Sequence, residues 1–445
     1  MLSISKALRI SSSRIIAFVG AGGKTSAMLQ AARELSPVLV TTSTHLLNGQ
    51  GLLADHHLIW EPDGPMPELE AWLGSGITLV TGNLDPVKQR YLGATPTQLE
   101  KLRQLAGYHN LPLLIESDGA RQRAIKAPAE HEPAIPGFVD MVVVVAGLTG
   151  LGRNLGEEAV HRPEIFGSLC GLNQGEIVTP SALARVLSHP MGGVKNIPPG
   201  ARRVVLLNQA YTPELQSQAN EIGQMLLPVF DAVIVAALQP PPGVVIAVKQ
   251  NTAGIILAAG ASSRFGQPKQ LLDYHGEPFV RVVAKTALKA GLSPVVVVVG
   301  ANADAITKAL ENLPLTIVHN SEWMAGQSTS MKAGLNHLPD NTGGAIFLLA
   351  DQPQVSVELL RALMERHSQD LPPILAPYVF DQRANPLLFD RITFADLLTV
   401  TGDTGGRAIF SKFSPFYLNW YDKRLLLDVD TPDDYQKLLN QESDS

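Results

Sequence analysis

The chain has 445 residues, of which 45% are hydrophobic and 17% charged, and this length favours two globular domains over a single core. Its formal net charge of −6 provides no general attraction for nucleic acid or an anionic membrane, so partners of these two classes are not expected. A single cysteine, Cys170, excludes an internal disulfide framework, and the longest aliphatic runs are too short to span a bilayer, so we expect a cytoplasmic protein.

Short apolar runs recur along the chain and are separated by segments with helical spacing. Their length and β-branched content predict buried strands, and their alternation with helices is typical of parallel sheets. The predicted strands are RIIAFVG, PVLVTTS, LPLLIES, VDMVVVVAG and RRVVLLNQ in the first half, then AGIILAAG, PVVVVVG, LTIVHN and AIFLLAD in the second. The sequence therefore predicts an α/β protein.

A proline-rich segment separates two such series of strands and helices. It contains three consecutive prolines and a glycine, QPPPG, after which a new strand begins. We therefore expect an N-terminal domain over 1–240, a linker over 241–251 and a C-terminal domain over 252–445. Each domain begins with a strand, a turn of small residues and a helix, but the two turns differ in design, so we interpret the domains as unrelated modules.

The C-terminal domain opens with LAAGASSRFGQPK, directly after an apolar run. Small residues in a turn let backbone N–H groups approach a ligand closely, and a phosphate group is a ligand that such a turn can hold. Arg264 adds a multidentate guanidinium, and Lys269 adds a mobile ammonium that can follow charge on a phosphoryl group. The whole pattern favours a nucleotide site over a plain strand-to-helix turn with solvated basic residues.

This motif resembles the signature of the MobA-like nucleotidyltransferases, and it is most similar to their molybdenum cofactor cytidylyltransferase branch. The resemblance covers about residues 252–440, where HNSEWMAGQSTSMKAGL, FLLADQP, NPLLF, GDTGGR and LDVDTPDDY follow in the family's order. It implies a three-layer, Rossmann-like fold of the nucleotide-diphospho-sugar transferase (GT-A-like) type. It also implies a nucleotidyltransferase in which Arg264, Lys269 and Asp351 are catalytic.

Two acidic positions are expected in such an enzyme, because Mg²⁺ held by carboxylate oxygens neutralises the α-phosphate and the departing pyrophosphate. Asp351 ends an apolar strand, at the edge where open α/β sheets bind ligands, and the resemblance makes it the first metal ligand. The alternative role for Asp351 is to cap the following helix. The resemblance assigns the second metal position to Asp430, with Asp428 as its rival.

The resemblance also divides the other site residues between nucleotide and acceptor. On the nucleotide side it implies Leu257, Ala258, Ala259, Gly260, Ser262, Ser263, Gly326, Ser328 and Ser330, although serines before a helix also act as simple caps. On the acceptor side it implies Asn385, Pro386, Asp403, Gly405 and Arg407. Many relatives carry histidine where Ala384 or Asn385 stands here. The pair Ala258 and Ala259 resembles cytidylyl-transferring members, so CTP is predicted rather than GTP.

The predicted reaction is attack by the terminal phosphate of molybdenum-molybdopterin on the α-phosphorus of CTP, with release of pyrophosphate. The acceptor is already an anion, so positioning and charge neutralisation suffice without a strong protein base. Two alternatives stay open. One is a sugar-phosphate or polyol-phosphate nucleotidyltransferase, and the other is a nucleotide-dependent chaperone that inserts the cofactor into a hydroxylase.

The N-terminal domain opens with RIIAFVGAGGKTS, in which Gly20, Gly22, Gly23, Lys24 and Thr25 stand where a phosphate-binding loop would put them. The spacing departs from a Walker A loop, because Phe18 occupies the position of that loop's first glycine. The motif alone supports a shortened P-loop in a parallel sheet and a structural tight turn equally.

Further segments resemble a family of YqeC-like proteins, accessory to selenium-dependent hydroxylases. The resemblance covers about residues 12–238 through LVTTSTHL, TLVTGNLDPVKQRYLG, IESDGARQRAIKAPAEHEPAIP and VHRPEIF. Glu116 and Asp118 end a strand facing the glycine turn, where a carboxylate could assist Mg²⁺. We therefore predict a second nucleotide site that includes Asp118, and a bifunctional protein whose partner is a molybdenum hydroxylase apo-enzyme. The polar residues His45, His131, Glu132 and His161 lie in other family-like segments, where ordinary polar contacts are a commoner role than metal binding.

Overall fold

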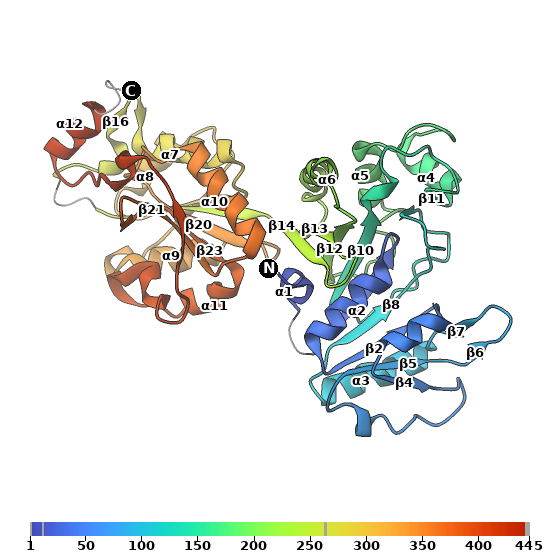
Figure 1. Ribbon diagram of the computed structural model, residues 1–445. Helices are drawn as coiled ribbons and strands as arrows, with labels where there is room; N and C mark the ends of the chain where they lie inside the picture. The colour runs from blue at the N-terminus through green and yellow to red at the C-terminus, as the bar shows by residue number, and fades with distance from the viewer. Residues whose placement is uncertain (1, 11–12, 262–264, 441–445) are drawn as a thin grey trace. The chain divides into compact units, whose positions relative to one another are not determined.

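The computed structural model describes residues 2–10, 13–261 and 265–440. The chain divides into two compact units, Met1–Lys249 and Gln250–Ser445, each of which is described here by itself. Both units are built on sheets of mainly parallel strands with helices between them, so the predicted α/β class is confirmed (Figure 1).

The N-terminal unit contains a nine-stranded sheet. All neighbouring strands are parallel except β13 and β14. In spatial order the strands are β14 (Val244–Lys249), β13 (Ala232–Ala237), β12 (Arg202–Asn208), β10 (Met141–Gly147), β1 (Ile15–Gly20), β8 (Leu113–Glu116), β2 (Val38–Thr42), β5 (Ile77–Thr81) and β4 (His56–Ile59). The strand β1 therefore lies between β10 and β8, with the glycine turn at its carboxyl end.

Helices cover both faces of this sheet. The helices are α1 (Ile4–Leu8), α2 (Lys24–Leu35), α3 (Pro96–Tyr108), α4 (Pro163–Cys170), α5 (Pro180–Ser188) and α6 (Pro213–Leu226). Ile15, Ala17 and Val19 join an apolar cluster that includes residues of α3 to α6, and α2 contacts β1, β2 and β8. Two small sheets complete the unit, one of β3 (His45–Leu47), β7 (Arg90–Leu92) and β6 (Leu84–Asp85), the other of β9 (Ile125–Lys126) and β11 (Val160–His161).

The segment 241–251, expected as a linker, contains a strand of the N-terminal sheet. Residues Val244–Lys249 form β14, which pairs antiparallel with β13. The prolines at 240–242 and Gly243 make the turn between the two strands, and Val245, Ala247 and Val248 are buried. The proline-rich stretch is therefore a turn within the unit, and only Gln250 and Asn251 separate β14 from the first strand of the next unit.

The C-terminal unit contains an eight-stranded mixed sheet. Its parallel part consists of β19 (Thr316–His319), β18 (Val295–Val299), β15 (Thr252–Ala258) and β20 (Gly344–Leu349), in this spatial order. The order continues through β23 (Leu387–Asp390), which is antiparallel to β20, then β21 (Ile374–Val379) and β22 (Gln382–Arg383), while β24 (Phe416–Asn419) pairs with β21. A hairpin of β16 (Asp273–Tyr274) and β17 (Glu277–Pro278) lies outside this sheet.

Helices also cover both faces of the C-terminal sheet. One apolar cluster combines Ile256 of β15 with residues of α7 (Phe279–Ala290), α8 (Ala303–Ala309) and α10 (Val357–Asp370). Another combines Ile255 with residues of α9 (Gln327–Leu335) and α11 (Phe394–Leu397). Because neighbouring strand residues point to opposite faces, these clusters make three layers. The helix α12 (Pro432–Asn440) follows the last site segment, and no described helix of the chain is long and apolar enough to cross a bilayer.

Candidate functional site

A polar cavity of about 610 Å³ lies beside the carboxyl ends of β15 and β20. Eight of the residues singled out in the sequence line it, namely Leu257, Asp351, Asn385, Asp403, Gly405, Arg407, Asp428 and Asp430. They come from five separate segments of the chain, and β15 and β20 are parallel neighbours in the sheet. The predicted metal carboxylates and the predicted acceptor loops therefore face one cavity.

Four aspartates line this cavity, Asp351, Asp403, Asp428 and Asp430, and Asp351 is the most buried of them. Burial raises the pKa of the Asp351 carboxyl; the ammonium of Lys269 opposes the rise, and the charges of Asp428 and Asp430 add to it. Val429, between the two C-terminal aspartates, packs in a small apolar cluster with Leu272 and fixes their segment. A carboxylate cluster of this kind has a surplus of negative charge that a cation can neutralise.

Lys269 and Asp430, which lie 161 positions apart, form an ion pair. The Lys269 Nζ donates to the Asp430 Oδ1 at 2.7 Å, with the lysine side chain 11% exposed and the aspartate 62% exposed. The predicted phosphate-binding ammonium therefore contacts the predicted metal ligand. Because the aspartate side chain is open to water, Asp430 can leave the pair at little cost, whereas the buried ammonium of Lys269 favours a replacement anion.

Gln352 is a cavity residue that the sequence analysis missed. Its Nε2 donates to the Oδ1 of Asp428 at 3.0 Å, and its buried Oε1 has no hydrogen-bond partner among the described residues. Asp428, the rival for the second metal position, is thus held by an amide while Asp430 is held by a lysine. The signal in the sequence was the position of Gln352 directly after Asp351, but an amide there carries no chemistry that singles it out.

A side-chain hydrogen bond from Gln270 holds the small-residue turn in place. Ala258 and Ala259 are buried, Gly260 is exposed, and the Gln270 Nε2 donates to the Gly260 carbonyl at 2.8 Å. Ser262, Ser263 and Arg264 lie outside the described residues. Lys269 itself belongs to a short 3₁₀ helix, Lys269–Leu271.

The start of α9 holds the other predicted nucleotide contacts, Gly326, Ser328 and Ser330. Both serines are buried, and the Asn320 Nδ2 donates to the Ser330 Oγ at 3.0 Å. None of the three lines the cavity, whereas Gln327 of the same segment does. Gly326 adopts a positive φ of 112°, which glycine tolerates.

The acceptor-side loop is joined directly to α9. The Asp403 Oδ1 accepts a hydrogen bond from the backbone N–H of Gln327 at 3.1 Å, and therefore caps a helix from 76 residues away. Gly405 has φ 55° and ψ −152°, and a Cβ there would lie 2.7 Å from the Gln327 Oε1. Only glycine fits this backbone. Asn385 and Arg407 line the cavity but Pro386 does not.

The glycine turn of the N-terminal unit packs tightly on strand β10. Gly20, Gly22 and Gly23 all have positive φ, and a Cβ on Gly20 would lie 2.2 Å from the Val145 carbonyl oxygen. The backbone N–H of Gly22 donates to the Arg123 carbonyl at 3.0 Å, so this amide is already used inside the protein. The glycines therefore have a structural reason to be present, beside any role in ligand binding.

Lys24 and Thr25 begin α2 and contact two acidic residues at the end of β8, Glu116, which is its last residue, and Asp118, two positions later. The Thr25 Oγ1 donates to the Glu116 Oε2 at 2.8 Å, while the Lys24 Nζ lies 3.1 Å from the Asp118 Oδ1 and donates to the Gly20 carbonyl at 2.8 Å. Burial alone would lower the pKa of the lysine ammonium, but the charges of Asp118 and Glu116 outweigh this effect and raise the pKa. Burial raises the pKa of Glu116.

A second polar cavity, of about 660 Å³, opens beside this helix start. Gly22, Gly23, Lys24 and Thr25 line it together with Glu116. His45, Glu132 and His161 also line it, whereas His131 is exposed elsewhere. Among the described residues of the whole chain, no group of three or more histidine, cysteine, aspartate or glutamate side chains is arranged to hold a metal ion.

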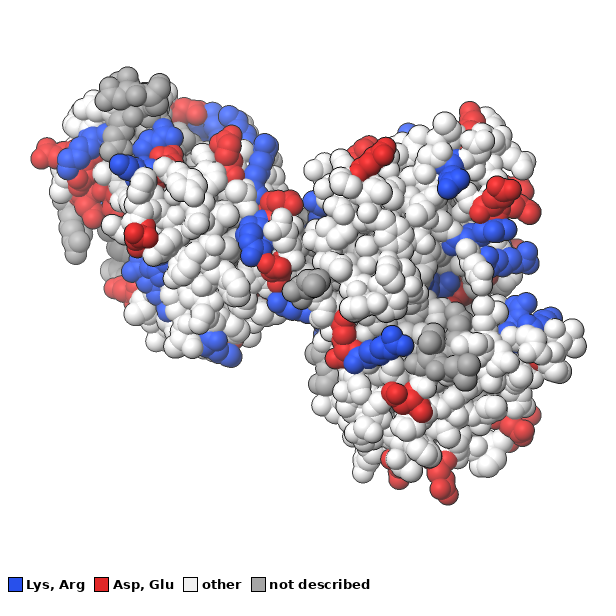
Figure 2. All heavy atoms as spheres, viewed as in Figure 1, with Lys and Arg blue, Asp and Glu red and all other residues white. Residues whose placement is uncertain are grey.

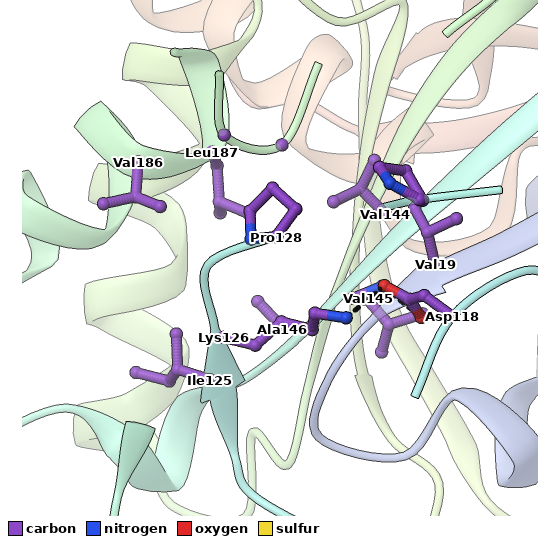
Figure 3. A pocket seen from close by; sticks show the side chains of 14 residues that line it. Val19, Asp118, Ile125, Lys126, Pro128, Val144, Val145, Ala146, Val186 and Leu187 are labelled. Carbon is purple, nitrogen blue, oxygen red and sulfur yellow. Dashed lines mark hydrogen bonds and ion pairs between the residues drawn. The ribbon is translucent and has the colours of Figure 1, made fainter. Parts of the chain in front are cut away.

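Asp118 and Gly20 line a different, much smaller cavity of about 30 Å³ behind the glycine turn. Figure 3 shows the Lys126 ammonium pointing at the Asp118 carboxylate, at 2.7 Å, among aliphatic side chains. The same carboxylate accepts from the Gly20 backbone N–H at 2.9 Å. Asp118 therefore holds the glycine turn in place, and of the two acidic residues at the end of β8 it is Glu116 that lines the larger cavity.

Comparisons with known proteins identify both units. A family model described as the MobA-like NTP transferase domain matches residues 254–416, and a model described as YqeC protein matches residues 16–164. YqeC of Escherichia coli strain K12 is 34% identical over 199 residues, which cover 44% of this chain and 75% of that protein. Nicotine blue oxidoreductase of Paenarthrobacter nicotinovorans is 33% identical over 202 residues, which cover 42% of this chain and 95% of that one.

The chain belongs to the YqeC family and to the MobA-like NTP transferase family. Its C-terminal unit is therefore a nucleotidyltransferase of the MobA type. The purine catabolism protein PucB of Bacillus subtilis strain 168 is a further relative, 31% identical with 41% of this chain and 93% of its own length covered. Among solved structures, Rv0371c of Mycobacterium tuberculosis H37Rv is 29% identical, with 42% of this chain and 97% of that chain covered and a TM-score of 0.39.

Proposed function

We propose that the C-terminal unit transfers the cytidylyl group of CTP to molybdenum-molybdopterin and releases pyrophosphate, with Mg²⁺ as its cofactor. The observation that carries the proposal is that Asp351 and Asp430 line the same cavity as Asn385, Asp403 and Arg407. A nucleotidyl transfer requires a charged donor and a charged acceptor to meet in one place, and this cavity offers groups for both.

The cavity's carboxylates suit a hard divalent cation. Mg²⁺ in phosphoryl-transfer sites commonly takes one or two carboxylates, with phosphate oxygens and water completing its shell. Asp351 and Asp430 can supply this pair, and Asp428 is the alternative second ligand because it lines the same cavity. When bound, Mg²⁺ supplies charge neutralisation at the α-phosphate and at the departing pyrophosphate.

The chain's own residues would then orient the two anions. Lys269 can exchange its contact with Asp430 for one with a phosphate of the nucleotide, since the aspartate is open to water. Arg407 offers a planar guanidinium to the acceptor phosphate, and Asn385 offers an amide that can donate and accept at the acceptor. No protein group needs to remove a proton, because the attacking phosphate is already ionised.

A substrate panel tests this function. The purified chain is incubated with Mg²⁺ and CTP, GTP or ATP, with molybdenum-molybdopterin or a sugar phosphate as acceptor, and pyrophosphate and product mass are measured. We expect pyrophosphate release only with the pterin acceptor, and we expect the rate of release to be highest with CTP. A product carrying a sugar phosphate would establish the alternative transferase, and absence of pyrophosphate above the level without acceptor would reject the transfer reaction.

We further propose that the N-terminal unit binds a nucleotide at the start of α2 and hands the cofactor product to a molybdenum hydroxylase apo-enzyme. Lys24, Thr25 and Glu116 support this because they reproduce a lysine, a hydroxyl and a carboxylate at a strand-turn-helix junction. Calorimetric titration with ATP, GTP and CTP, in the Asp351→Asn background, is the test. Thr25→Val should weaken binding and Arg33→Gln, at the far end of the same helix, should not; equal binding by both variants would contradict the site.

A further inference from the structure

The larger N-terminal cavity has an excess of positive charge. Its lining includes five lysine and arginine side chains, Lys24, Arg90, Arg121, Arg123 and Arg162, against two carboxylates, Glu116 and Glu132. The chain as a whole has a formal net charge of −6, so this excess is local. In Figure 2 basic side chains gather at the right-hand edge of the unit, between the regions of β11 and of the β7 hairpin.

The two carboxylates of the cavity are already paired with cations of the protein, two of which are Lys24 and Arg162 of the same lining. Glu116 accepts from Thr25 and lies 4.0 Å from the Lys24 ammonium. Glu132 accepts from the Arg162 Nη1 at 2.7 Å and Nη2 at 3.0 Å, and from the Lys126 Nζ at 2.8 Å. Lys24 and Arg162 are therefore compensated inside the protein.

The remaining three arginines, Arg90, Arg121 and Arg123, are named here the arginine wall. Within the described part of the chain, none of them forms an ion pair with an aspartate or a glutamate. The Arg90 Nε has no hydrogen-bond partner there either. Guanidinium groups that line a cavity and lack a protein counter-charge favour an anionic ligand.

The loop that holds Arg121 and Arg123 is fixed to the glycine turn. Arg121 and Gln122 both have positive φ, 47° and 60°, which non-glycine residues adopt only when their surroundings hold them there. The Arg123 N–H donates to the Ala120 carbonyl at 3.0 Å, and the Arg123 carbonyl accepts from Gly22 at 3.0 Å. The guanidinium groups are therefore carried by a defined turn next to the start of α2.

The two histidines of the cavity do not add charge at neutral pH. The Arg90 Nη1 lies 3.0 Å from the His45 Nε2, and a guanidinium can only donate, so this ring nitrogen is the acceptor of a neutral imidazole. Burial and the arginine lower the pKa of His45, and burial with Arg162 and Lys126 lowers the pKa of His161 to about 4. These two histidines should therefore add little pH dependence to anion binding between about pH 6 and 8, where the phosphate ligand itself still titrates.

We propose that the arginine wall is a second anion subsite of the N-terminal cavity, which takes a phosphate group in addition to the one at the start of α2. This subsite goes beyond the proposed nucleotide site, because it requires that the cavity bind two anionic groups at the same time. The second phosphate group belongs either to the same polyphosphate chain or to a separate small organic phosphate.

Hydrogen exchange of the full-length chain locates such binding by peptide. The probes are inorganic phosphate and inorganic tripolyphosphate, added to the parent chain, to an Arg121→Gln/Arg123→Gln variant and to an Arg33→Gln/Arg153→Gln control with the same loss of charge at exposed sites of this unit. We expect both probes to protect peptides over residues 119–124 in the parent and the control. The wall variant should bind roughly tenfold more weakly for each lost guanidinium contact.

The two probes distinguish the two sources of the second phosphate group. If one polyphosphate spans both subsites, the wall variant weakens tripolyphosphate binding more than phosphate binding. If two separate ligands bind, phosphate protects residues 23–26 and 119–124 independently, and the wall variant loses only the protection at 119–124. Equal affinities of the wall variant and the control would overturn the proposal. The Thr25→Val variant should lose protection at 23–26 while 119–124 stays protected. The nucleotide site at the start of α2 and the arginine wall are thus tested separately. The Arg121→Lys/Arg123→Lys variant, which keeps both positive charges, controls for folding and should retain more of the 119–124 protection than the glutamine variant.

Discussion

Single residues of the C-terminal cavity combine burial with like charge. Burial and two further aspartates raise the pKa of Asp351, and the charge of Lys269 and a backbone hydrogen bond only partly oppose the rise. A carboxylate arranged in this way lowers the stability of the ligand-free chain, because too little positive charge lies near it. A bound cation would supply that charge and so stabilise the site. Such an arrangement is typical of functional sites.

Replacing Asp351 with asparagine should lower the transferase activity without lowering the stability of the chain. Nucleotidyl transfer should fall by about 10²–10³-fold, the size expected when one charge-stabilising group is lost. The pKa of Asp351 is raised in the folded chain, so its charged form costs stability at neutral pH, and the unfolding temperature of the variant should be no lower than that of the parent. Pyrophosphate release and calorimetry measure the two effects. Asp340→Asn, an exposed aspartate of the same unit, should change neither.

Glu132 shows the opposite electrostatic behaviour in the N-terminal unit. Burial raises the pKa of this carboxyl, but its bonds to Arg162 and Lys126 outweigh burial and lower the pKa from 4.5 to about 2. The stability it contributes is therefore fully present above about pH 4.5 and is lost as the pH falls toward 2.

Glu132→Gln should lower the free energy of unfolding of the N-terminal unit by about 1–3 kcal/mol at pH 7, allowing for partial screening by water. The difference between parent and variant should shrink as the pH falls from 4.5 toward 2, because the parent carboxylate becomes protonated. Calorimetric scans at pH 7 and at acid pH check this. Glu130→Gln, whose side chain has no described bond, should match the parent, and a difference that is constant with pH would contradict the assignment.

The sequence predicted site residues that stand in recognisable motifs. It missed features that depend on contact with a residue distant in the sequence. Asp351 and Arg407 lie in recognisable segments, and both line the cavity. The pair of Lys269 with Asp430 and the amide of Gln352 depend on contacts across more than 75 positions, and no local pattern records such contacts. The roles of all these residues remain predictions until the variants are measured.

Among the elements, the strands were the easiest to predict. The valine-rich runs became β10 and β18 because four or five consecutive β-branched residues fit only a strand buried on both faces. The strand β14 was missed because its turn of three prolines was interpreted as a linker. Proline ends one strand here without ending the sheet, and this distinction requires knowing the partner strand.

The helix α9 depends on a distant residue for its first turn. Asp403 caps Gln327, so Asp403→Ala should leave that N–H unpaired and weaken the helix start by about 1 kcal/mol. Because the same residue lines the cavity, the KM for the acceptor should rise. Hydrogen exchange over residues 326–330 and steady-state kinetics measure the two effects. Asp304→Ala, in the first turn of α8 without a described cap bond, should affect neither.

At the scale of the whole molecule, each unit has its own sheet, apolar core and polar cavity. The division between Lys249 and Gln250 falls between the two family matches, YqeC at 16–164 and the MobA-like transferase at 254–416. Sequence resemblance could identify the two families from local motifs. It could not establish that the connection between the two sheets is only two residues long.

Separate cores predict separate responses to ligands. A ligand that binds only the folded form at 100 times its Kd stabilises its unit by about 2.7 kcal/mol, which for a unit of this size raises the unfolding temperature by roughly 5–10 °C. Mg²⁺ with CTP should therefore raise the calorimetric transition of the C-terminal unit by this amount, and Asp351→Asn should abolish the shift. Glu132→Gln identifies the N-terminal transition by lowering it alone. A single transition that both variants move together would show that the units unfold as one and would contradict this independence.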